Sequence, residues 1–528
     1  MIKDTISRKE TTFFSKVAND FIYAPEIFED FVHRIPSNEA ITKQLKEKQK
    51  EFSQNQRSFL VETLEKQYES VESSEKTQKQ ITALNDSSTF TVTTGHQLSI
   101  FTGPLFFIYK ILHIIKWCDQ LNEKFSDYHF VPVYWMASED HDFEEINHFN
   151  VFGQYFEWES EQKGAVGRFQ LNDFQAFKQS VKERFSNDSE ICDLVEKHYK
   201  ENDSLSLATF KLVHELFEKR GLLVIEPDNK ALKTSFKSIL KKEIESEFSA
   251  KAVRTKSEKL DELGYKTQVN PRAINLFYLS EGKRERIIKE GNTFHIGENN
   301  FSFDDLIDKI EKHPENFSPN VVLRPVYQEF ILPNLAYVGG SGEIAYWLQL
   351  KDVFETLALT FPLLQIRNSI QLFDGTTQKK INKLELEVKD TFKPLEKVKK
   401  QIVLDHSEED LDFSGLEELS IQLSAQIKDL IGSVDEGLKG YGESESVKLN
   451  KQIEGMKAKL IRHQKKKFET TLQQLENVYD RLFPEGRLQE RHDNGLVYFA
   501  KHGILSFIDE IYTLIDPNEK DLILGIEE

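Results

Sequence analysis

The chain has 528 residues, more than a single hydrophobic core usually holds, so we expect two or more domains. Hydrophobic residues make up 39% and charged residues 30%, which predicts a packed protein with long solvated helices. With 69 Lys and Arg against 88 Asp and Glu, the net charge of −19 argues against general nucleic-acid binding. Two cysteines, Cys118 and Cys192, exclude a disulfide framework and a four-cysteine zinc site, which fits a reducing compartment.

Targeting signals are missing from the sequence. Residues 1–10 are polar and contain no apolar signal-peptide core. No apolar run reaches the length of a membrane span. We therefore expect a cytoplasmic protein that binds neither membranes nor nucleic acid.

Residues 91–110 read as a strand, a polar loop and the start of a helix. Gly95 can end the strand, and Pro104 suits the first turn of a helix that Thr102 or Gly103 caps. Such a junction gathers free N–H groups and a partial positive charge, which suits a phosphate. An ordinary βα turn without a ligand explains the same spacing. The predicted nucleotide contacts in this stretch are Thr94, Gly95, His96, Thr102 and Gly103.

A second apolar run, residues 130–137, predicts a buried strand that ends at a dense polar cluster. Continuous apolar strands belong to parallel sheets that are covered on both faces, and strand–helix–strand is the βαβ unit. Ligands of these sheets bind at the carboxyl ends of the strands. Residues 95–97 and 139–142 both fall at such ends, so the sequence predicts a site there.

The cluster at residues 139–142 contains groups that can position or deprotonate a substrate amine. Strand alternation would place Asp140 and Asp142 on one side and Glu139 and His141 on the other. Histidine titrates near neutral pH, which makes His141 a candidate base. A capped, solvated helix start would look the same in sequence. We predict that Asp140, His141 and Asp142 are catalytic, and we predict no metal site because the spacing matches no standard metal motif.

Residues 334–343 read as a strand that runs into a glycine loop. The amides of this loop could face an anion, although a tight strand-to-helix turn explains the glycines equally well. The predicted nucleotide contacts here are Gly339, Gly340 and Ser341. Arginine suits carboxylate or phosphate, which makes Arg324 a candidate partner. The predicted substrate-binding residues are Gln97, Glu139, Asn147, Arg324, Tyr337 and Glu343.

The apolar runs around five residues predict one mainly parallel sheet with helices between its strands. These residues are Val92, Val131, Leu223, Leu335 and Leu364. A long charged helix is expected over residues 229–263. We expect this α/β core to span residues 1–375, with insertions of short strands and helices at about 150–220 and 260–318.

Beyond Gly375 the apolar residues recur at three- and four-residue steps, which predicts an antiparallel coiled-coil arm over residues 376–483. Loops are expected near residues 405–414 and 433–445, with a stutter before Phe468. Residues 484–528 should return to the core. The arm has more apolar seam than three short helices hide, so we expect a homodimer.

Three blocks of this sequence also follow the pattern of a known family. They are Thr94–Lys110, Val131–Asn147 and Leu335–Trp347, in this order and followed by a coiled-coil region. Together they resemble the BshC family, the cysteine-adding ligases of bacillithiol synthesis. The resemblance spans nearly the full chain, and the Glu-Asp-His-Asp block at 139–142 is quite specific. His96 departs from the pattern, which has glutamine here in many members.

The resemblance implies a Rossmann-like core with inserted connective segments and a dimer built through the coiled coil. It also implies the last biosynthetic step, an amide between the cysteine carboxyl group and the amine of glucosaminyl malate. A free carboxylate must be activated first. By analogy, ATP would form a cysteinyl adenylate from which the sugar amine displaces AMP, so ATP or ADP is the expected cofactor.

Two other functions fit the same residues. A scaffold protein could hold a nucleotide in these loops without turnover, and an assay with cysteine, ATP and glucosaminyl malate separates that reading from the ligase. A metal-dependent hydrolase is the runner-up among enzymes, and metal analysis of the purified protein discriminates it.

Overall fold

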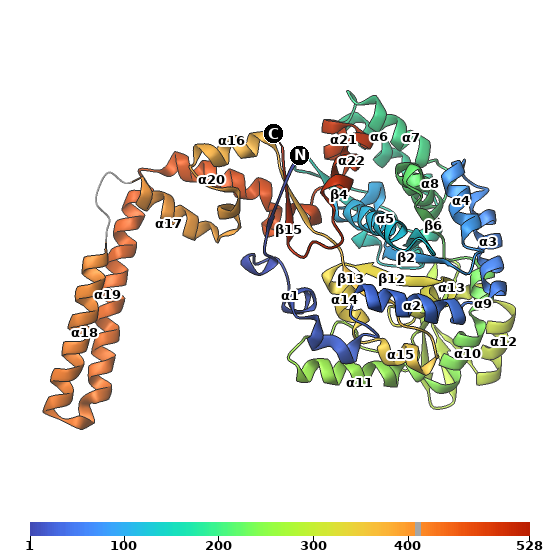
Figure 1. Cartoon of the computed structure of the whole chain (residues 1–528), viewed down its shortest axis with the longest axis horizontal. Coiled ribbons are helices and arrows are strands. Elements are labelled where there is room, and N and C mark those ends of the chain that lie inside the picture. The colour runs from blue at the N-terminus through green and yellow to red at the C-terminus, as the bar shows by residue number, and fades with distance from the viewer. Residues whose placement is uncertain (407–412, 528) are drawn as a thin grey trace. The chain divides into compact units, whose positions relative to one another are not determined.

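The computed structural model describes residues 1–406 and 413–527, which form two compact units (Figure 1). Unit 1 comprises residues 1–371 and 488–525. Unit 2 comprises residues 372–487 and the chain end from Ile526. Among the helices of these described ranges, none combines the length and apolar character that crossing a membrane requires.

A five-stranded parallel sheet lies at the centre of unit 1, in the order β13-β12-β2-β3-β6. Its strands are β2 (Thr89–His96), β3 (His129–Met136), β6 (Leu223–Ile225), β12 (Asn334–Gly339) and β13 (Leu363–Ile366). Nearly every residue of these strands is buried, because helices cover both faces of the sheet and leave apolar side chains on each. The predicted parallel sheet of five strands is confirmed.

Helix α5 (Phe106–Lys124) connects β2 to β3 and packs against both strands. The predicted helix start at Thr102 to Pro104 is wrong. A short 3-10 turn, η3 (Ile100–Thr102), comes first, and Thr102 and Gly103 have positive φ angles of 70° and 61°. The side-chain amide of Asn494 donates to the carbonyls of Phe101 (2.9 Å) and Gly103 (2.7 Å), which holds this turn and delays the helix.

The N-terminal segment and the two insertions surround this sheet. The N-terminal elements are β1 (Ile2–Ile6), α1 (Lys16–Tyr23), α2 (Asn38–Glu51), α3 (Gln54–Tyr68) and α4 (Glu75–Ala83). The first insertion holds a hairpin and three helices: β4 (His148–Val151), β5 (Gln154–Glu157), α6 (Gln175–Arg184), α7 (Ser189–His198) and α8 (Leu205–Phe217).

The second insertion is an antiparallel sheet of short strands in the order β10-β9-β8-β7-β11. Its elements are β7 (Leu276–Ser280), β8 (Lys283–Glu290), β9 (Thr293–Ile296), β10 (Asn299–Phe301), α12 (Phe303–Lys312) and β11 (Phe317–Pro319). The long helix expected before it is three helices, α9 (Lys230–Ser235), α10 (Lys237–Ser246) and α11 (Phe248–Glu262). The breaks fall at the buried Phe236 and at Glu247, whose φ of 50° no α-helix accommodates.

The rest of unit 1 completes the core. Its helices are α13 (Arg324–Ile331), α14 (Ser341–Trp347), α15 (Lys351–Thr356), α21 (Leu496–His502) and α22 (Ile504–Leu514). A small sheet in the order β1-β15-β14 contains the strands β14 (Ile370–Phe373) and β15 (Leu522–Ile526), and the chain passes out of unit 1 within each of these two strands.

Unit 2 is helical, as the predicted coiled-coil arm requires (Figure 1). Its helices are α16 (Gly375–Lys383), α17 (Leu395–Asp405), α18 (Ser414–Val434), α19 (Lys439–Lys465) and α20 (Glu469–Leu482). Helices α18 and α19 form an antiparallel hairpin, across which the Ser420 hydroxyl donates to Asn450 at 2.6 Å.

The connections within unit 2 differ from the predicted ones. The link between α18 and α19 is four residues, 435–438, and therefore shorter than the expected loop at 433–445. The expected stutter is a break between α19 and α20 at residues 466–468. Of the other expected loop, residues 407–412 lie outside the described ranges.

Candidate active site

The carboxyl ends of β2, β3 and β12 meet at one edge of the sheet. In the register of β2 and β3, Gly95 lies beside Trp135 and His96 beside Met136. The next residue, Gln97, reaches across to the segment that follows β3, and its side-chain amide donates to Asp140 at 2.9 Å and to Glu145 at 2.8 Å. The predicted meeting of the two polar segments therefore occurs through Gln97.

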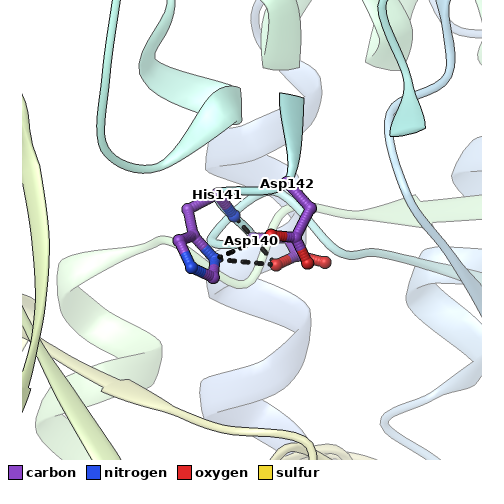
Figure 2. A group of neighbouring side chains, drawn as sticks. All are labelled: Asp140, His141 and Asp142. Carbon is purple, nitrogen blue, oxygen red and sulfur yellow. Dashed lines mark hydrogen bonds and ion pairs between the residues drawn. The ribbon is translucent and has the colours of Figure 1, made fainter. Parts of the chain in front are cut away.

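Asp140, His141 and Asp142 turn their side chains toward one another (Figure 2). The prediction that these residues alternate along a strand is wrong, because β3 ends at Met136 and the chain then turns. The Asp140 amide donates back to Ala137 at 3.3 Å, and a 3-10 turn, η4 (Phe143–Glu145), follows. Asp140 is half-buried, whereas His141 and Asp142 are exposed.

Arg284, on β8 of the second insertion, completes this group. Its Nη1 lies 2.9 Å from Nδ1 of His141 and 3.7 Å from Oδ1 of Asp140, and its guanidinium lies over the Phe277 ring at 3.9 Å. We call Gln97, Asp140, His141, Asp142 and Arg284 the edge cluster.

The contacts within the edge cluster favour the charged form of Asp140 and determine which ring nitrogen of a neutral His141 carries the proton. Burial opposes ionisation of Asp140, but the Gln97 hydrogen bond and the Arg284 charge outweigh it and lower the pKa of that carboxyl. An arginine N–H can only donate, so Nδ1 of His141 accepts and a neutral ring carries its proton on Nε2. The ring therefore presents a donor while Arg284 stays in place.

The same three residues are the candidate metal ligands among the described residues. One ligand atom each from Asp140, His141 and Asp142 lies within 4.8 Å of the others. Arg284 opposes such a use, because its positive charge lies 2.9 Å from Nδ1 of His141, beside the place where a cation would bind.

A second group lies beside β12, and we call it the buried cluster: Lys110, Arg324, Tyr337, Glu343 and Tyr346. Lys110 is 1% exposed, and its Nζ donates to the Gly95 carbonyl and to Glu343, each at 2.5 Å. Glu343 also accepts from the Tyr337 hydroxyl at 2.6 Å and from the Gly340 amide at 2.8 Å. The amide that was expected to face an anion is thus taken by Glu343.

Lys110 and Glu343 each stabilise the charged form of the other. Burial raises the pKa of Glu343, but the Lys110 charge and the three donors outweigh it, so the pKa is lowered overall. Burial also lowers the pKa of Lys110, and Glu343 counteracts that shift only in part. The pair is closed, because each charge has its partner within the protein.

Arg324 carries a charge that no carboxylate within the described ranges pairs at ion-pair distance. Its guanidinium donates to Gln328 at 3.1 Å and to the Tyr346 hydroxyl at 3.4 Å. A Cβ atom at Gly95 would lie only 3.2 Å from Nη1 of Arg324, so glycine permits this close approach. Arg324 is therefore the cation of the site that an anionic ligand group can bind.

His96 lies beside the buried cluster, with its ring against those of Phe106 and Phe107 at 5.2 Å each. Burial, helped by the charge of Lys110, lowers the pKa of His96 to about 3. Its Nε2 atom is buried without a hydrogen-bond partner. His96 is therefore neutral near physiological pH and contributes shape and polarity rather than charge.

Several predicted nucleotide-binding residues are buried in the fold. Thr94 donates to the Val338 carbonyl at 2.7 Å and thereby joins β2 to β12. Thr102 and Gly103 lie in the buried turn that precedes α5. Gly339 ends β12, and Gly340 and Ser341 lie where α14 begins.

Two predicted substrate-binding residues have internal partners. Asn147 is buried and donates to Glu157 and to the Trp158 carbonyl, both at 3.2 Å, which holds the β4–β5 hairpin. Glu139 is paired with the fully buried Lys233, away from the alternating arrangement that the sequence indicated. Burial raises the pKa of Glu139 in spite of that lysine.

Sequence reasoning missed Lys110, Lys233, Arg284 and Tyr346 as members of these clusters. Lys110 had a usable signal, because it is the one charged residue within the run 106–112, whose other members are apolar or aromatic. Arg284 had none, because it belongs to a separate insertion and meets His141 only in the folded chain.

Known protein families and curated proteins match nearly the whole chain. The family model described as "Bacillithiol biosynthesis BshC, N-terminal Rossmann-like domain" matches residues 1–368, and "Bacillithiol biosynthesis BshC, C-terminal coiled-coil domain" matches residues 370–524. A protein of Flavobacterium johnsoniae named "Putative cysteine ligase BshC" is 39% identical over 508 residues, which are 95% of this chain and 96% of that protein. A protein of Christiangramia forsetii with the same name is 38% identical over 530 residues, covering 99% and 98%.

Proposed function

The chain belongs to the BshC family of bacillithiol biosynthesis, and from this membership we propose that it is a cysteine ligase. The reaction joins the carboxyl group of cysteine to the amine of glucosaminyl malate. Besides the family, the observation that supports this proposal is that a cation and a carboxylate lie near the same edge of the sheet. The unpaired cation Arg324 lies against Gly95, and Asp140, held ionised, is bonded to Gln97 two residues further on.

Amide formation from a free carboxylate needs a leaving group on the carboxyl carbon. In the proposed reaction, a cysteine carboxylate oxygen attacks the α-phosphorus of ATP and pyrophosphate leaves. The amine of glucosaminyl malate then attacks the carbonyl carbon of the adenylate, AMP leaves with the bonding electron pair, and the nitrogen loses a proton.

Arg324 suits the first half of this reaction. Its planar guanidinium matches a carboxylate or phosphate, and the buried surroundings strengthen its attraction for an anion. We assign it to the cysteine carboxylate or the α-phosphate. Lys110 stays paired with Glu343 and fixes the Gly95 carbonyl, so we assign it to positioning the loop.

The edge cluster suits the second half. Asp140 is ionised and can accept hydrogen bonds from the ammonium form of the substrate and then from the attacking amine. His141 can accept the released proton at Nδ1 once a substrate group draws Arg284 away. Because the cluster is half-exposed, a substrate group can replace His141 as the partner of Arg284.

A ligase assay tests the proposal. The purified full chain with cysteine, ATP and glucosaminyl malate should form bacillithiol, detected by mass spectrometry, with AMP and pyrophosphate in equal amounts. Glucosaminyl malate acetylated on its nitrogen is the matched control, because it lacks the attacking amine. Release of ADP and phosphate would replace the adenylate with an acyl phosphate, and nucleotide binding without product would favour the scaffold function.

The clustering of Asp140, His141 and Asp142 within 4.8 Å favours a second candidate, a metal-dependent hydrolase. Its test is metal analysis of the purified protein. Stoichiometric bound metal would support the hydrolase, whereas loss of ligase activity on chelation would not, because ATP itself acts with a divalent cation.

We further propose that the protein forms a homodimer through the α18–α19 hairpin. Apolar side chains remain more than 45% exposed along both helices: Leu419, Ile421, Leu423, Leu430, Val434, Tyr441, Val447, Met456 and Leu460. Replacing the arm by a short linker should give a monomer by light scattering, and Ile421→Lys with Leu430→Lys should weaken the dimer without removing the arm. An unchanged dimer in both proteins would rule out this interface.

A further inference from the structure

A cavity of about 400 Å³ lies in unit 1, apart from the sheet edge that carries the candidate active site. Its walls come from the N-terminal segment, the second half of α5, strand β13 and the loop at residues 517–520. Trp117 in this wall lies eleven residues beyond Phe106, which is about 16 Å along the helix from its N-terminus. The volume is in the range of small-molecule sites.

The walls of this cavity are mostly apolar and partly flat. Trp117 and Phe21 contribute aromatic rings, and Ile22, Pro25 and Ile366 contribute aliphatic surface. Aromatic and proline surfaces of this kind favour a planar, apolar ligand body over a flexible polar one.

The charged residues of the lining are mainly basic, in a chain whose net charge is −19. Lys124 and Lys520 are exposed side chains at the cavity, and neither has an ion-pair partner among residues 1–406 and 413–527. Arg8 is 1% exposed and donates to two carbonyls, those of Lys520 and Arg367. Its Nη1 has no hydrogen-bond partner, so a buried positive charge lies behind the cavity without a bound carboxylate.

We propose that this cavity binds an aromatic carboxylate. The ring system lies against Trp117 and the aliphatic wall, and the carboxylate group faces Lys124 and Lys520. The field of Arg8 adds to the attraction, since a buried charge is screened less than an exposed one. The site is independent of the ligase reaction, so its test does not depend on turnover.

The charge requirement is tested with two probes that share one ring system. 1-Naphthaleneacetate carries a carboxylate, and 1-naphthaleneacetamide is its neutral counterpart. Calorimetric titration of the full chain should show about one site per chain and at least about fivefold tighter binding of the carboxylate, as expected of two exposed cations that each contribute modestly. Equal binding of the two probes, or no binding of either, would overturn the proposal.

Location is tested with two pairs of variants. Ile22→Trp fills the cavity and should abolish binding of both probes, whereas Ile27→Trp places the same ring at an exposed residue outside the lining and should leave binding unchanged. Lys124→Glu with Lys520→Glu should remove the preference for the carboxylate.

Lys251→Glu with Lys259→Glu is the matched control, because it changes the net charge equally at exposed positions on α11. A thermal melt of every variant confirms folding before titration. If the cavity-filling variant binds like its control, or if both charge pairs lower the preference equally, the probes bind elsewhere and the assignment is wrong.

Discussion

The buried cluster and the edge cluster of unit 1 each contain a carboxylate with a cation beside it, Glu343 with Lys110 and Asp140 with Arg284, yet the two pairs differ in the distance between their charged groups. The Glu343 and Asp140 side chains are almost equally exposed, at 28% and 29%. Lys110 lies 2.5 Å from Glu343, whereas Arg284 lies 3.7 Å from Asp140. The cation, and not the acid, therefore distinguishes the two sites.

This difference separates a structural pair from a reactive one. A closed pair has already exchanged water for protein partners, and breaking it leaves an uncompensated charge. An open pair retains unsatisfied hydrogen-bonding capacity, which a substrate can take up. We therefore expect changes in the buried cluster to affect stability first and changes in the edge cluster to affect turnover first.

The largest effect should come from Lys110→Met. This change leaves Glu343 without its cation, and we expect the free energy of unfolding to fall by about 3 kcal/mol, at the low end for a broken buried pair because Glu343 is partly exposed. Urea denaturation measures it.

Lys66→Met is the matched control, because Lys66 pairs with Glu62 on the surface of α3 at 2.7 Å and should change stability little. Lys110→Met combined with Glu343→Leu should recover part of the loss, since no charge is then left alone. Equal stability of the Lys110→Met and Lys66→Met variants would show that the buried pair is not closed.

Next in size is His141→Asn, on the open side of the comparison. We expect turnover to fall about 100-fold with the fold retained, because asparagine keeps a polar side chain but cannot carry a proton near neutral pH. Steady-state kinetics and circular dichroism measure the two quantities.

Asp140→Asn serves as the companion variant. It should weaken use of the amine substrate more than nucleotide binding, because the Asp140 carboxylate faces the amine in the proposed reaction. Near-normal turnover in both variants would make the cluster structural and remove the basis of the comparison.

Sequence reasoning reached the parallel sheet and the meeting of its strand ends because both follow from local patterns. The apolar runs around Val92 and Val131 fix two neighbouring strands, and the crossover helix between them makes the strands parallel. Once the strands are parallel, Gln97 and Asp140 must lie at the same edge, as they do at 2.9 Å.

The contacts between side chains of the site could not be predicted from local sequence patterns. Arg284 lies 143 residues from His141 in the chain, and only the folding of an insertion brings them together. Side chains alternate between the two faces of a sheet only within a strand. Because β3 ends at Met136 and the chain then turns, the alternation predicted for residues 139–142 does not occur. The late start of α5 depends on Asn494, nearly 400 residues away from the turn it holds.

A smaller effect is expected from Arg284→Gln, which opens the edge cluster further. Turnover should fall about tenfold because His141 and Asp140 lose the group that orients them. The pKa of Asp140, which Arg284 lowers, should rise toward its ordinary value.

The acid limb of the pH profile of kcat/KM should then move to higher pH in the Arg284→Gln variant. Lys283→Gln, one residue earlier on β8 and pointing to the other face of the strand, is the control. A shifted limb in the control as well would assign the effect to net charge instead of contact.

The smallest effect concerns His96, which lies beside the closed pair without joining it. The pKa of His96 is about 3 in the folded protein, against about 6.5 for an ordinary histidine in the unfolded chain. Above pH 6.5 neither state binds the proton, so His96 does not make stability depend on pH. Below pH 6.5 His96 binds a proton in the unfolded chain but not in the folded protein. The free energy of unfolding therefore falls as the pH falls.

His96→Gln should therefore flatten the pH dependence of stability, because glutamine is neutral in both states. Between pH 6.5 and 5.5 we expect the loss of stability to be about 1 kcal/mol smaller than in the unmodified protein. Urea denaturation at the two pH values measures the difference, and His313→Gln, at an exposed position, should leave it unchanged. A slope that His96→Gln does not alter would mean that His96 takes up its proton within the fold, and the surroundings of the Lys110–Glu343 pair would then be open to water after all.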